Sequence, residues 1–306
     1  MKRATPADSP LGGATIVLGC EPLGGTDCGR VDLSEAIAAI SHGLELGINA
    51  FDTADVYGLG QSEIVLSNAL GSRRHDAVII SKFGVNWENQ EPGGRARTYR
   101  DSSPQHVRKA LEGSLRRLRV DRIPVYVVHW PDPKTPITST MEALMECREK
   151  GLIGNIGVSN FSAAQLTEAA AVAVPDVAEA QLSLLDRNTL REFAPSCVRL
   201  GVSLLAYGTL AQGLLTGKYE TGIRFEADDR RSRLPHFAPA RMEQSAPLLE
   251  AIAERARQLN CTMAQVAIRW VLDQPGVTAA IVAAKSPSQV QEAVESAKFR
   301  VDLSDL

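Results

Sequence analysis

The sequence has few of the residues that mark disulfide-bonded or metal-binding proteins. Its five cysteines are scattered and odd in number, and no two of them form a CxxC pair. Its five histidines show no metal-ligand spacing either. This pattern argues against a disulfide framework and against a zinc site. We therefore expect no bound metal and a reduced, cytoplasmic setting.

The sequence also lacks an excess of one charge and long apolar runs. The formal net charge is −3 and 23% of the residues are charged, so we expect neither nucleic acid nor a membrane surface as a partner. No apolar run approaches the roughly 20 residues that a membrane span requires. The first residues, MKRATPADSPLGG, lack the apolar core of a signal peptide. The composition is that of a soluble globular protein.

Short apolar runs alternate along the chain with longer amphipathic stretches. The runs are almost continuously apolar, as expected for parallel strands that are buried on both faces. The predicted strands are residues 14–20, 48–54, 76–84, 123–130, 154–161, 176–183, 202–208 and 277–285. Eight strand–helix units in about 300 residues predict an α/β fold, a (β/α)8 TIM barrel of eight parallel strands with surrounding helices. We expect one domain over residues 1–306.

A doubly wound dinucleotide-binding sheet is the competing fold. It requires a glycine-rich phosphate turn after its first strand. The GLG at residues 58–60 lacks the third glycine and follows the second predicted strand. The sequence therefore favours the barrel.

Several helix ends carry the expected signals. Ser103–Pro104 and Ser286–Pro287 each resemble an N-cap followed by proline at the first helical position. Glycines that fall where helices are expected to end are Gly47, Gly71, Gly151 and Gly201.

Polar residues stand at or just after three consecutive predicted strands. Asp52 and Tyr57 follow the second strand, Lys82 ends the third, and His129 ends the fourth. Taken singly, each has an ordinary structural explanation, such as a capping aspartate, a packed tyrosine or a lysine that reaches solvent. Neighbouring barrel strands would nevertheless aim these complementary groups into one volume. We interpret the four as a site, and Asp55 as a turn residue.

The chemistry open to these four residues is specific. A phenol has a pKa of about 10 and is a poor acid at neutral pH. The Lys82 ammonium, held by Asp52, is expected to lower the pKa of Tyr57. His129 could donate to the same oxygen as Tyr57, so the group could protonate a carbonyl oxygen as an alkoxide forms. No side chain can deliver the hydride, which implies a nicotinamide cofactor.

A series of motifs resembles the aldo-keto reductase family over nearly the whole chain. They are GINAFDTADVYG, VIISKFG, VYVVHWPD, REKGLIGNIGVSNFS, LLDR, LLAYGTLAQGLLTGKY, AQVAIRWVLDQPGV and KSPSQVQEAVES. The resemblance implies a (β/α)8 barrel that reduces aldehydes and ketones with NADPH, or oxidises alcohols in reverse. It places the catalytic tetrad of the family on Asp52, Tyr57, Lys82 and His129, with Tyr57 as the general acid.

The same resemblance implies a set of cofactor-binding residues. Ser159 and Asn160 match the positions that hold the nicotinamide carboxamide. The segment 208–214 matches the loop over the pyrophosphate, and Lys285, Ser286 and Gln289 match the positions around the 2′-phosphate, which favours NADPH over NADH. The full predicted set is Ser159, Asn160, Gln181, Tyr207, Gly208, Thr209, Leu210, Gln212, Gly213, Lys285, Ser286 and Gln289.

The chain departs from the family pattern at several positions. Glu179 stands where a glutamine is common, and Gln181 lies two residues out of register. Leu182 stands at the position expected for an aromatic that stacks on the nicotinamide, so an apolar contact is expected there. Ala283 and Ala293 replace a glycine and an asparagine, which predicts modest cofactor affinity.

The substrate pocket is less well marked in the sequence. Candidate walls are Trp87, Trp130 and Leu23, and a short segment after the last helix predicts an open site not covered by residues 296–306. Two long polar stretches, 85–101 and 218–242, leave strand ends where a barrel builds its site. The second carries Arg224, Arg230, Arg231, Arg233 and Arg241, which form either a solvated loop or a clamp for an anionic ligand.

Two other functions remain open from the sequence. One is a regulatory subunit that binds the cofactor with little turnover, against which the complete set of four polar residues argues. The other is a lyase or aldolase with Lys82 as a Schiff-base nucleophile, which requires a lysine with a lowered pKa. The sequence names a small-molecule carbonyl substrate as the partner but fixes neither its identity, nor the reaction direction, nor the oligomeric state.

Overall fold

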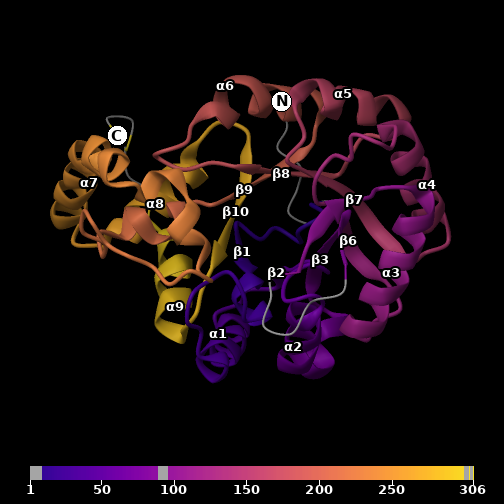
Figure 1. The fold of residues 1–306 in the computed structure, drawn as a ribbon, viewed down its shortest axis with the longest axis horizontal. Helices are drawn as coiled ribbons and strands as arrows, with labels where there is room; N and C mark the ends of the chain where they lie inside the picture. The colour runs from indigo at the N-terminus through magenta and orange to yellow at the C-terminus, as the bar shows by residue number, and fades with distance from the viewer. Residues whose placement is uncertain (1–8, 89–95, 300–302, 304–305) are drawn as a thin grey trace.

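The computed structural model describes residues 9–88, 96–299, 303 and 306. These residues form a closed barrel of eight parallel strands in the spatial order β1-β10-β9-β8-β7-β6-β3-β2 (Figure 1). The barrel strands are β1 (Ile16–Gly19), β2 (Ala50–Asp52), β3 (Val78–Phe83), β6 (Ile123–Val128), β7 (Ile153–Ser159), β8 (Val177–Gln181), β9 (Ser203–Tyr207) and β10 (Val277–Ala283). Each lies within a predicted strand or begins one residue before it, and the predicted barrel is confirmed.

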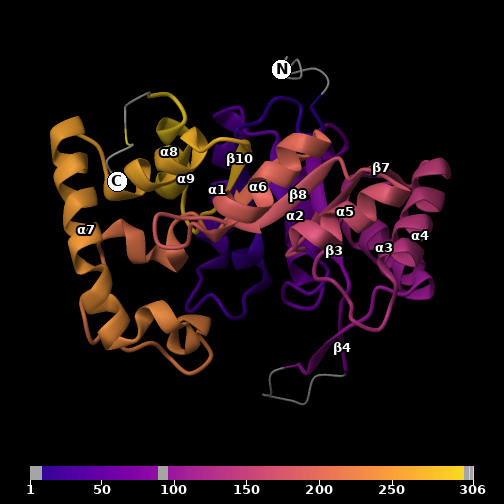
Figure 2. The same ribbon diagram turned by 90° about the horizontal axis from the view of Figure 1, so that it is seen from above.

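Helices surround the barrel on its outer side (Figures 1 and 2). They are α1 (Leu33–Glu45), α2 (Gln61–Leu70), α3 (Pro104–Leu118), α4 (Ile137–Glu149), α5 (Ala163–Val172), α6 (Asn188–Leu200), α7 (Pro239–Leu259), α8 (Met263–Asp273) and α9 (Pro287–Ser296). The Oγ of Ser103 accepts from the His106 N–H at 3.3 Å, which confirms that cap. Ser286 is the N-cap residue of α9, as predicted, and Pro287 follows it, but the Ser286 Oγ makes no cap bond to a backbone N–H and lies 3.0 Å from the Ser288 Oγ. The four predicted helix-end glycines all have positive φ.

Two hydrophobic cores lie on the two sides of the sheet. The larger core packs the outward-facing strand residues against the helices. The smaller core fills the barrel and consists of Leu11, Val17, Ala50, Ile80, Val125, Val127, Val177, Leu205, Ala279 and Ile281. Because side chains alternate between the faces of a strand, the residue two positions beyond each of these strand residues also faces the barrel interior. That spacing places the polar residues described below.

The two long polar stretches have structure of their own. The first forms an antiparallel pair of short strands, β4 (Val85–Trp87) and β5 (Thr98–Arg100). The second contains short 3₁₀ turns at Arg230–Arg233 and Pro235–Phe237 before α7 begins. Figure 2 shows β4 and this second stretch at the same end of the barrel.

Candidate active site

Each of the eight barrel strands contributes one inward-facing residue, at or near its last residue, to the carboxyl end of the barrel. We call these eight residues the inner layer. The layer is Gly19, Asp52, Lys82, His129, Ser159, Glu179, Tyr207 and Ala283, and all eight line one cavity of about 410 Å³. Ile80, for example, belongs to the inner core, and Lys82 follows it by two residues. His129 lies one residue past β6 but continues the pairing, because its N–H donates to the Phe83 carbonyl at 2.8 Å.

The four residues predicted to form a site lie together in this layer. Lys82 forms a buried ion pair with Asp52 and donates to the Thr53 carbonyl at 3.1 Å. Its Nζ lies 5.4 Å from the centroid of the Tyr57 ring. The rings of Tyr57 and His129 meet edge to face, with their centroids 5.7 Å apart. The structure therefore brings together an ammonium, a carboxylate, a phenol and an imidazole.

The Tyr57 phenol is less acidic than the sequence predicts. Burial raises the pKa of Tyr57 well above its ordinary value, and the charges of Asp52 and Glu179 add to this effect. The Lys82 ammonium acts in the opposite direction but does not prevail. The predicted lowering of the Tyr57 pKa is therefore wrong, because burial and the carboxylates beside Lys82 outweigh its charge. The phenol stays protonated at neutral pH.

Lys82 and His129 hold opposite charge states. Burial disfavours the Lys82 ammonium, but the carboxylates of Asp52 and Glu179 outweigh it and raise the pKa of Lys82. Burial, together with the charge of Lys82, holds the pKa of His129 well below its ordinary value. Lys82 is therefore an ammonium and His129 a neutral imidazole. An ammonium is not a nucleophile, so these contacts do not favour Schiff-base chemistry at Lys82.

Most of the predicted cofactor-binding residues line the same cavity. They are Ser159, Asn160, Tyr207, Gly208, Thr209, Leu210, Gln212, Gly213, Lys285 and Gln289. Asn160 has a φ of 62° and is fixed from two sides: its Nδ2 donates to the His129 carbonyl at 2.9 Å, and the Tyr207 hydroxyl donates to its Oδ1. These bonds tie the residue after β7 to the loop after β6 and to β9.

The far end of the cavity lies at the start of α9. The Lys285 N–H donates to the Gln289 Oε1 at 2.8 Å, and the Lys285 Nζ donates to the Cys28 carbonyl. Burial lowers the pKa of Lys285. Ser286 does not line the cavity. The cation and the amide at this end are the groups that could contact an anionic part of a ligand.

Two expectations about β8 need correction. Leu182 is fully buried in the outer core and does not line the cavity, so it offers no contact to a ligand there. Gln181, the last residue of β8, is exposed and also lies outside the cavity. Leu182 directly follows β8. Because side chains alternate along a strand, Leu182 faces outward where Glu179 faces inward. The aromatic side chain in this region of the cavity is Tyr207, on the neighbouring strand β9.

One of the three candidate substrate-pocket residues lines the cavity. Trp130 does so and is 37% exposed, with the Arg100 guanidinium 4.9 Å from its ring. Trp87 lies on β4 outside the cavity, and Leu23 is buried in the outer core. Of residues 296–306, those that the structure describes do not line the cavity. The rest of that segment lies outside the described residues.

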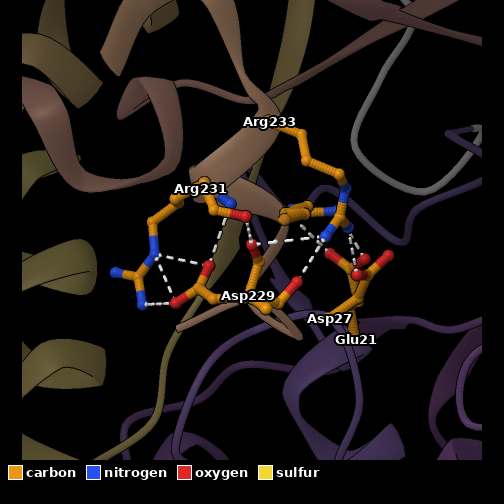
Figure 3. Close-up of polar contacts among 8 residues, drawn as sticks. Glu21, Asp27, Asp229, Arg231 and Arg233 are labelled. Carbon is orange, nitrogen blue, oxygen red and sulfur yellow. Dashed lines mark hydrogen bonds and ion pairs between the residues drawn. The ribbon is translucent and has the colours of Figure 1, made fainter. Parts of the chain in front are cut away.

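Ion pairs join the loop after β9 to the loop after β1 (Figure 3). Arg230 forms a bidentate pair with Glu21, at 2.5 and 2.6 Å, and Arg233 pairs with Asp27 at 2.6 Å. Arg231 pairs with Asp229 within its own loop. We call the Arg230–Glu21 and Arg233–Asp27 pairs the crossing pairs. Glu21, Asp27 and Arg230 also line the cavity, so the crossing pairs join the two loops beside it.

Sequence reasoning missed several residues of the cavity. Glu179 stands out in the sequence only as a departure from the family pattern, yet it lies in the inner layer, and counting in twos from Val177 would have found it. No local signal marks the other missed residues, which include Glu21, Cys28 and Glu292.

Two absences among the described residues bear on the class of protein. In this part of the chain, no group of histidines, cysteines and carboxylates could hold a metal ion. None of the described helices is both long and apolar enough to cross a bilayer. A parallel barrel with polar residues from several strands at its carboxyl end has the architecture of a TIM-barrel enzyme.

Comparison with known proteins gives the family. The model of the aldo/keto reductase family matches residues 15–306. The aldo-keto reductase YhdN of Bacillus subtilis (strain 168) is 32% identical over 308 residues, covering 100% of this chain and 91% of that protein. The NADH-specific methylglyoxal reductase of Escherichia coli (strain K12) is 31% identical, covering 97% of this chain and 94% of that protein.

Solved structures agree with this assignment. The glycerol dehydrogenase AKR11B4 from Gluconobacter oxydans has a TM-score of 0.88 and 35% identity, covering 99% of this chain and 91% of that one. An aldo/keto reductase from Klebsiella pneumoniae in complex with NADP and acetate has a TM-score of 0.71 and 25% identity, covering 95% and 88%. The chain belongs to the aldo/keto reductase family. It is an NAD(P)H-dependent oxidoreductase of carbonyl groups.

Proposed function

We propose that this protein reduces small aldehydes, ketones or keto-sugars to alcohols with NADPH, with Tyr57 as the general acid. The observation that carries the proposal is the buried Lys82–Asp52 pair beside Tyr57 and His129. These groups share one cavity with Lys285. The family match supports the same class of reaction.

Each of the four residues has a role in moving or stabilising charge. Tyr57 holds its proton at neutral pH because burial raises the pKa of the phenol, so the proton is present when charge develops on a carbonyl oxygen. The Lys82 ammonium stabilises that charge, and Asp52 keeps the ammonium in place. His129 is a neutral imidazole, which can donate a hydrogen bond to the same oxygen.

The residues along the cavity suit an elongated nicotinamide nucleotide. NADPH, when bound, would supply the hydride that no side chain can supply. Ser159 and Asn160, next to the tetrad, would hold the carboxamide, and residues 208–213 would lie against the pyrophosphate. A volume of about 410 Å³ is in the usual range for a cofactor site. The combination of amide and hydroxyl groups at one end with a lysine at the other fits this ligand.

Lys285 is the reason for proposing NADPH over NADH. Its ammonium would pair with the 2′-phosphate that only NADPH carries. Similar proteins differ here, since one is named NADH-specific and one is solved with NADP. Replacing Lys285 with alanine is expected to raise the Kd of NADPH about tenfold and that of NADH less than about twofold. Titration of tryptophan fluorescence with each cofactor measures both constants.

The exposed Lys298 offers a matched control for this substitution. Lys298→Ala is expected to leave both dissociation constants unchanged. An equal loss of NADPH and NADH affinity in Lys285→Ala would contradict a role of Lys285 in choosing between them.

The proposed reaction is tested with the unmodified protein. Aldehydes, ketones and keto-sugars are screened for oxidation of NADPH, and the matching alcohols for reduction of NADP+. The proposal predicts turnover in at least one of these classes. Tight NADPH binding without turnover in any class would favour a regulatory subunit, and absence of both binding and turnover would contradict either function.

A further inference from the structure

Glu179 is a buried carboxyl at the centre of the cavity that the proposed reaction does not use. It lies in the inner layer on β8, is 1% exposed and lines the cavity. Its Oε2 is 3.6 Å from the Lys82 Nζ. Its Oε1 has no hydrogen-bond partner among the residues that the structure describes. The carboxyl has Asp52 and Ser159 as hydrogen-bonding neighbours, so the unpaired Oε1 is the part of it that is left to interact with a ligand in the cavity.

Two carboxyls compete for one ammonium at this place. Asp52 on β2 already pairs with Lys82 on β3, so an ionised Glu179 gives the three groups a net negative charge. Burial, followed by the charge of Asp52, raises the pKa of Glu179 to about 8. The carboxyl can therefore gain or lose its proton near neutral pH.

The neighbours of Glu179 come from every adjacent element. They are Ser159 on β7, Tyr207 on β9, Lys82 and Asp52 from across the barrel, and Tyr57 from the loop after β2. Lys82 is the cation among these groups, and both tyrosines remain protonated because burial raises their pKa. Glu179 is thus the member of the set whose charge changes most readily.

We propose that ionised Glu179 makes the site prefer the oxidised form of the nicotinamide cofactor. The inference rests on the proposed function, which places the nicotinamide beside Ser159 and Asn160. The oxidised ring carries a positive charge and the reduced ring none, while both forms carry the same phosphates. A carboxylate in a buried site stabilises the charged ring and is indifferent to the neutral one. Glu179 therefore biases the site toward alcohol oxidation, and protonation removes the bias.

Thermodynamic linkage makes the bias visible in binding. If ionised Glu179 favours NADP+, then NADP+ must in turn favour ionised Glu179 and lower its pKa. Binding of NADP+ near neutral pH should therefore release a proton from Glu179, while binding of NADPH should not. The affinity for NADP+ should rise with pH until Glu179 is ionised in the free protein, and then level off. Ionisation of the 2′-phosphate affects both forms alike and cancels in their ratio.

The test compares dissociation constants of NADP+ and NADPH across the neutral range. In the unmodified protein, the ratio Kd(NADPH)/Kd(NADP+) is expected to rise about tenfold between about pH 6 and about pH 9. Glu179→Gln keeps the shape of the side chain and should abolish the rise, raising the Kd of NADP+ about tenfold at the alkaline end. Calorimetry in two buffers of different ionisation enthalpy should detect proton release on NADP+ binding, and Glu179→Gln should lose it.

Glu292 provides a matched control, since it lines the same cavity from α9, where its Oε1 accepts from the Thr262 hydroxyl. Glu292→Gln should change the affinity for NADP+ and NADPH by the same factor and keep the pH dependence of the ratio. A ratio that does not vary with pH in the unmodified protein would overturn the inference, even if Glu179→Gln failed to fold. Glu179→Gln weakening both forms equally would also overturn it. Binding of neither form to the unmodified protein would instead contradict the proposed function.

Discussion

Asp55 lies between Asp52 and Tyr57 in the chain but is a different kind of residue. It occupies a turn, as expected, yet it is 2% exposed, and its Oδ1 has no hydrogen-bond partner among the described residues. Burial, followed by the charge of Glu63, raises the pKa of Asp55 well above its ordinary value. At the scale of single residues, burial is the main cause of the charge states of Asp55, Tyr57 and His129.

The raised pKa of Asp55 has a consequence for stability. In the unfolded chain, an aspartate ionises above a pKa of about 3.9, whereas the buried carboxyl in the folded protein resists ionisation. The folded state therefore loses stability as the pH rises above about 3.9, until the buried carboxyl itself ionises. Asp55→Asn removes this loss. The free energy of unfolding should rise by about 1 kcal/mol or more at about pH 8 and change less at about pH 4. Urea unfolding at the two pH values measures the effect.

The exposed Asp76 is the control for this experiment. Asp76→Asn should leave the stability nearly unchanged at both pH values. If Asp55→Asn destabilised the protein most at alkaline pH, Asp55 would be ionised and held by Arg117, and the raised pKa of Asp55 would be wrong.

At the scale of elements, the loop after β2 is held against the loop after β1 by a close approach of two glycines. Gly58 directly follows Tyr57 and has a φ of 58°. A Cβ on Gly58 would lie 2.2 Å from the Gly24 carbonyl oxygen. Any side chain there must push the two loops apart, so glycine at 58 fixes the position of Tyr57.

Gly58→Ala should therefore lower stability and activity together. Gly201 is a useful comparison, because it has a left-handed backbone with a φ of 74°, but no atom lies within 4 Å of the place that its Cβ would take. Gly201→Ala should cost only the backbone strain of roughly 1–2 kcal/mol, and Gly58→Ala distinctly more. Thermal unfolding of the two variants gives the comparison. An equal loss of stability in the two variants would show that the close approach to Gly24 does not constrain the loop.

The crossing pairs should control how fast the cofactor leaves. Arg230 is bidentate to Glu21 and its side chain is 34% exposed, while that of Arg233 is 41% exposed. Exposed pairs contribute only about 0–1 kcal/mol, so Arg233→Ala should speed release of NADPH by less than about fivefold, and Arg230→Ala by more. Stopped-flow displacement of bound NADPH measures the release rates. Added salt screens the ion pairs, so it should reduce the difference in release rate between each variant and the unmodified protein.

Arg241 lies in the same polar stretch but at the start of α7, where it bonds Gln244, so Arg241→Ala is the control. It should release NADPH at the normal rate. Release from Arg230→Ala at that same rate would contradict the role of the crossing pairs.

At the scale of the whole molecule, the barrel was predictable because its signals are local and repeat. Buried parallel strands require apolar runs, and outer helices require amphipathic stretches, so each of the eight units carries its own pattern. The position of the stretch 218–242 was not predictable, because it contacts a loop that is distant in sequence. The pairs of Arg230 with Glu21 and of Arg233 with Asp27 span more than 200 residues.

The site was predictable in part for the same reason. Asp52, Lys82 and His129 stand out as polar residues after apolar runs, and the structure brings them to Tyr57. The acidity of Tyr57 could not be predicted, because it depends mainly on how deeply the phenol is buried. The position of Leu182 was predicted wrongly because a family resemblance does not show which face of a strand a residue occupies.

The most direct test of the account is the rate of a single turnover in Tyr57→Phe. With enzyme in excess and NADPH bound, stopped-flow absorbance follows the reduction of a carbonyl substrate without product release. Tyr57→Phe should slow this step by about 100-fold to 10,000-fold, with the Kd of NADPH nearly unchanged. Tyr99→Phe, on the exposed strand β5, should react at the normal rate. A Tyr57→Phe rate within about threefold of normal would lie far below the effect of a general acid and would contradict the assignment of Tyr57.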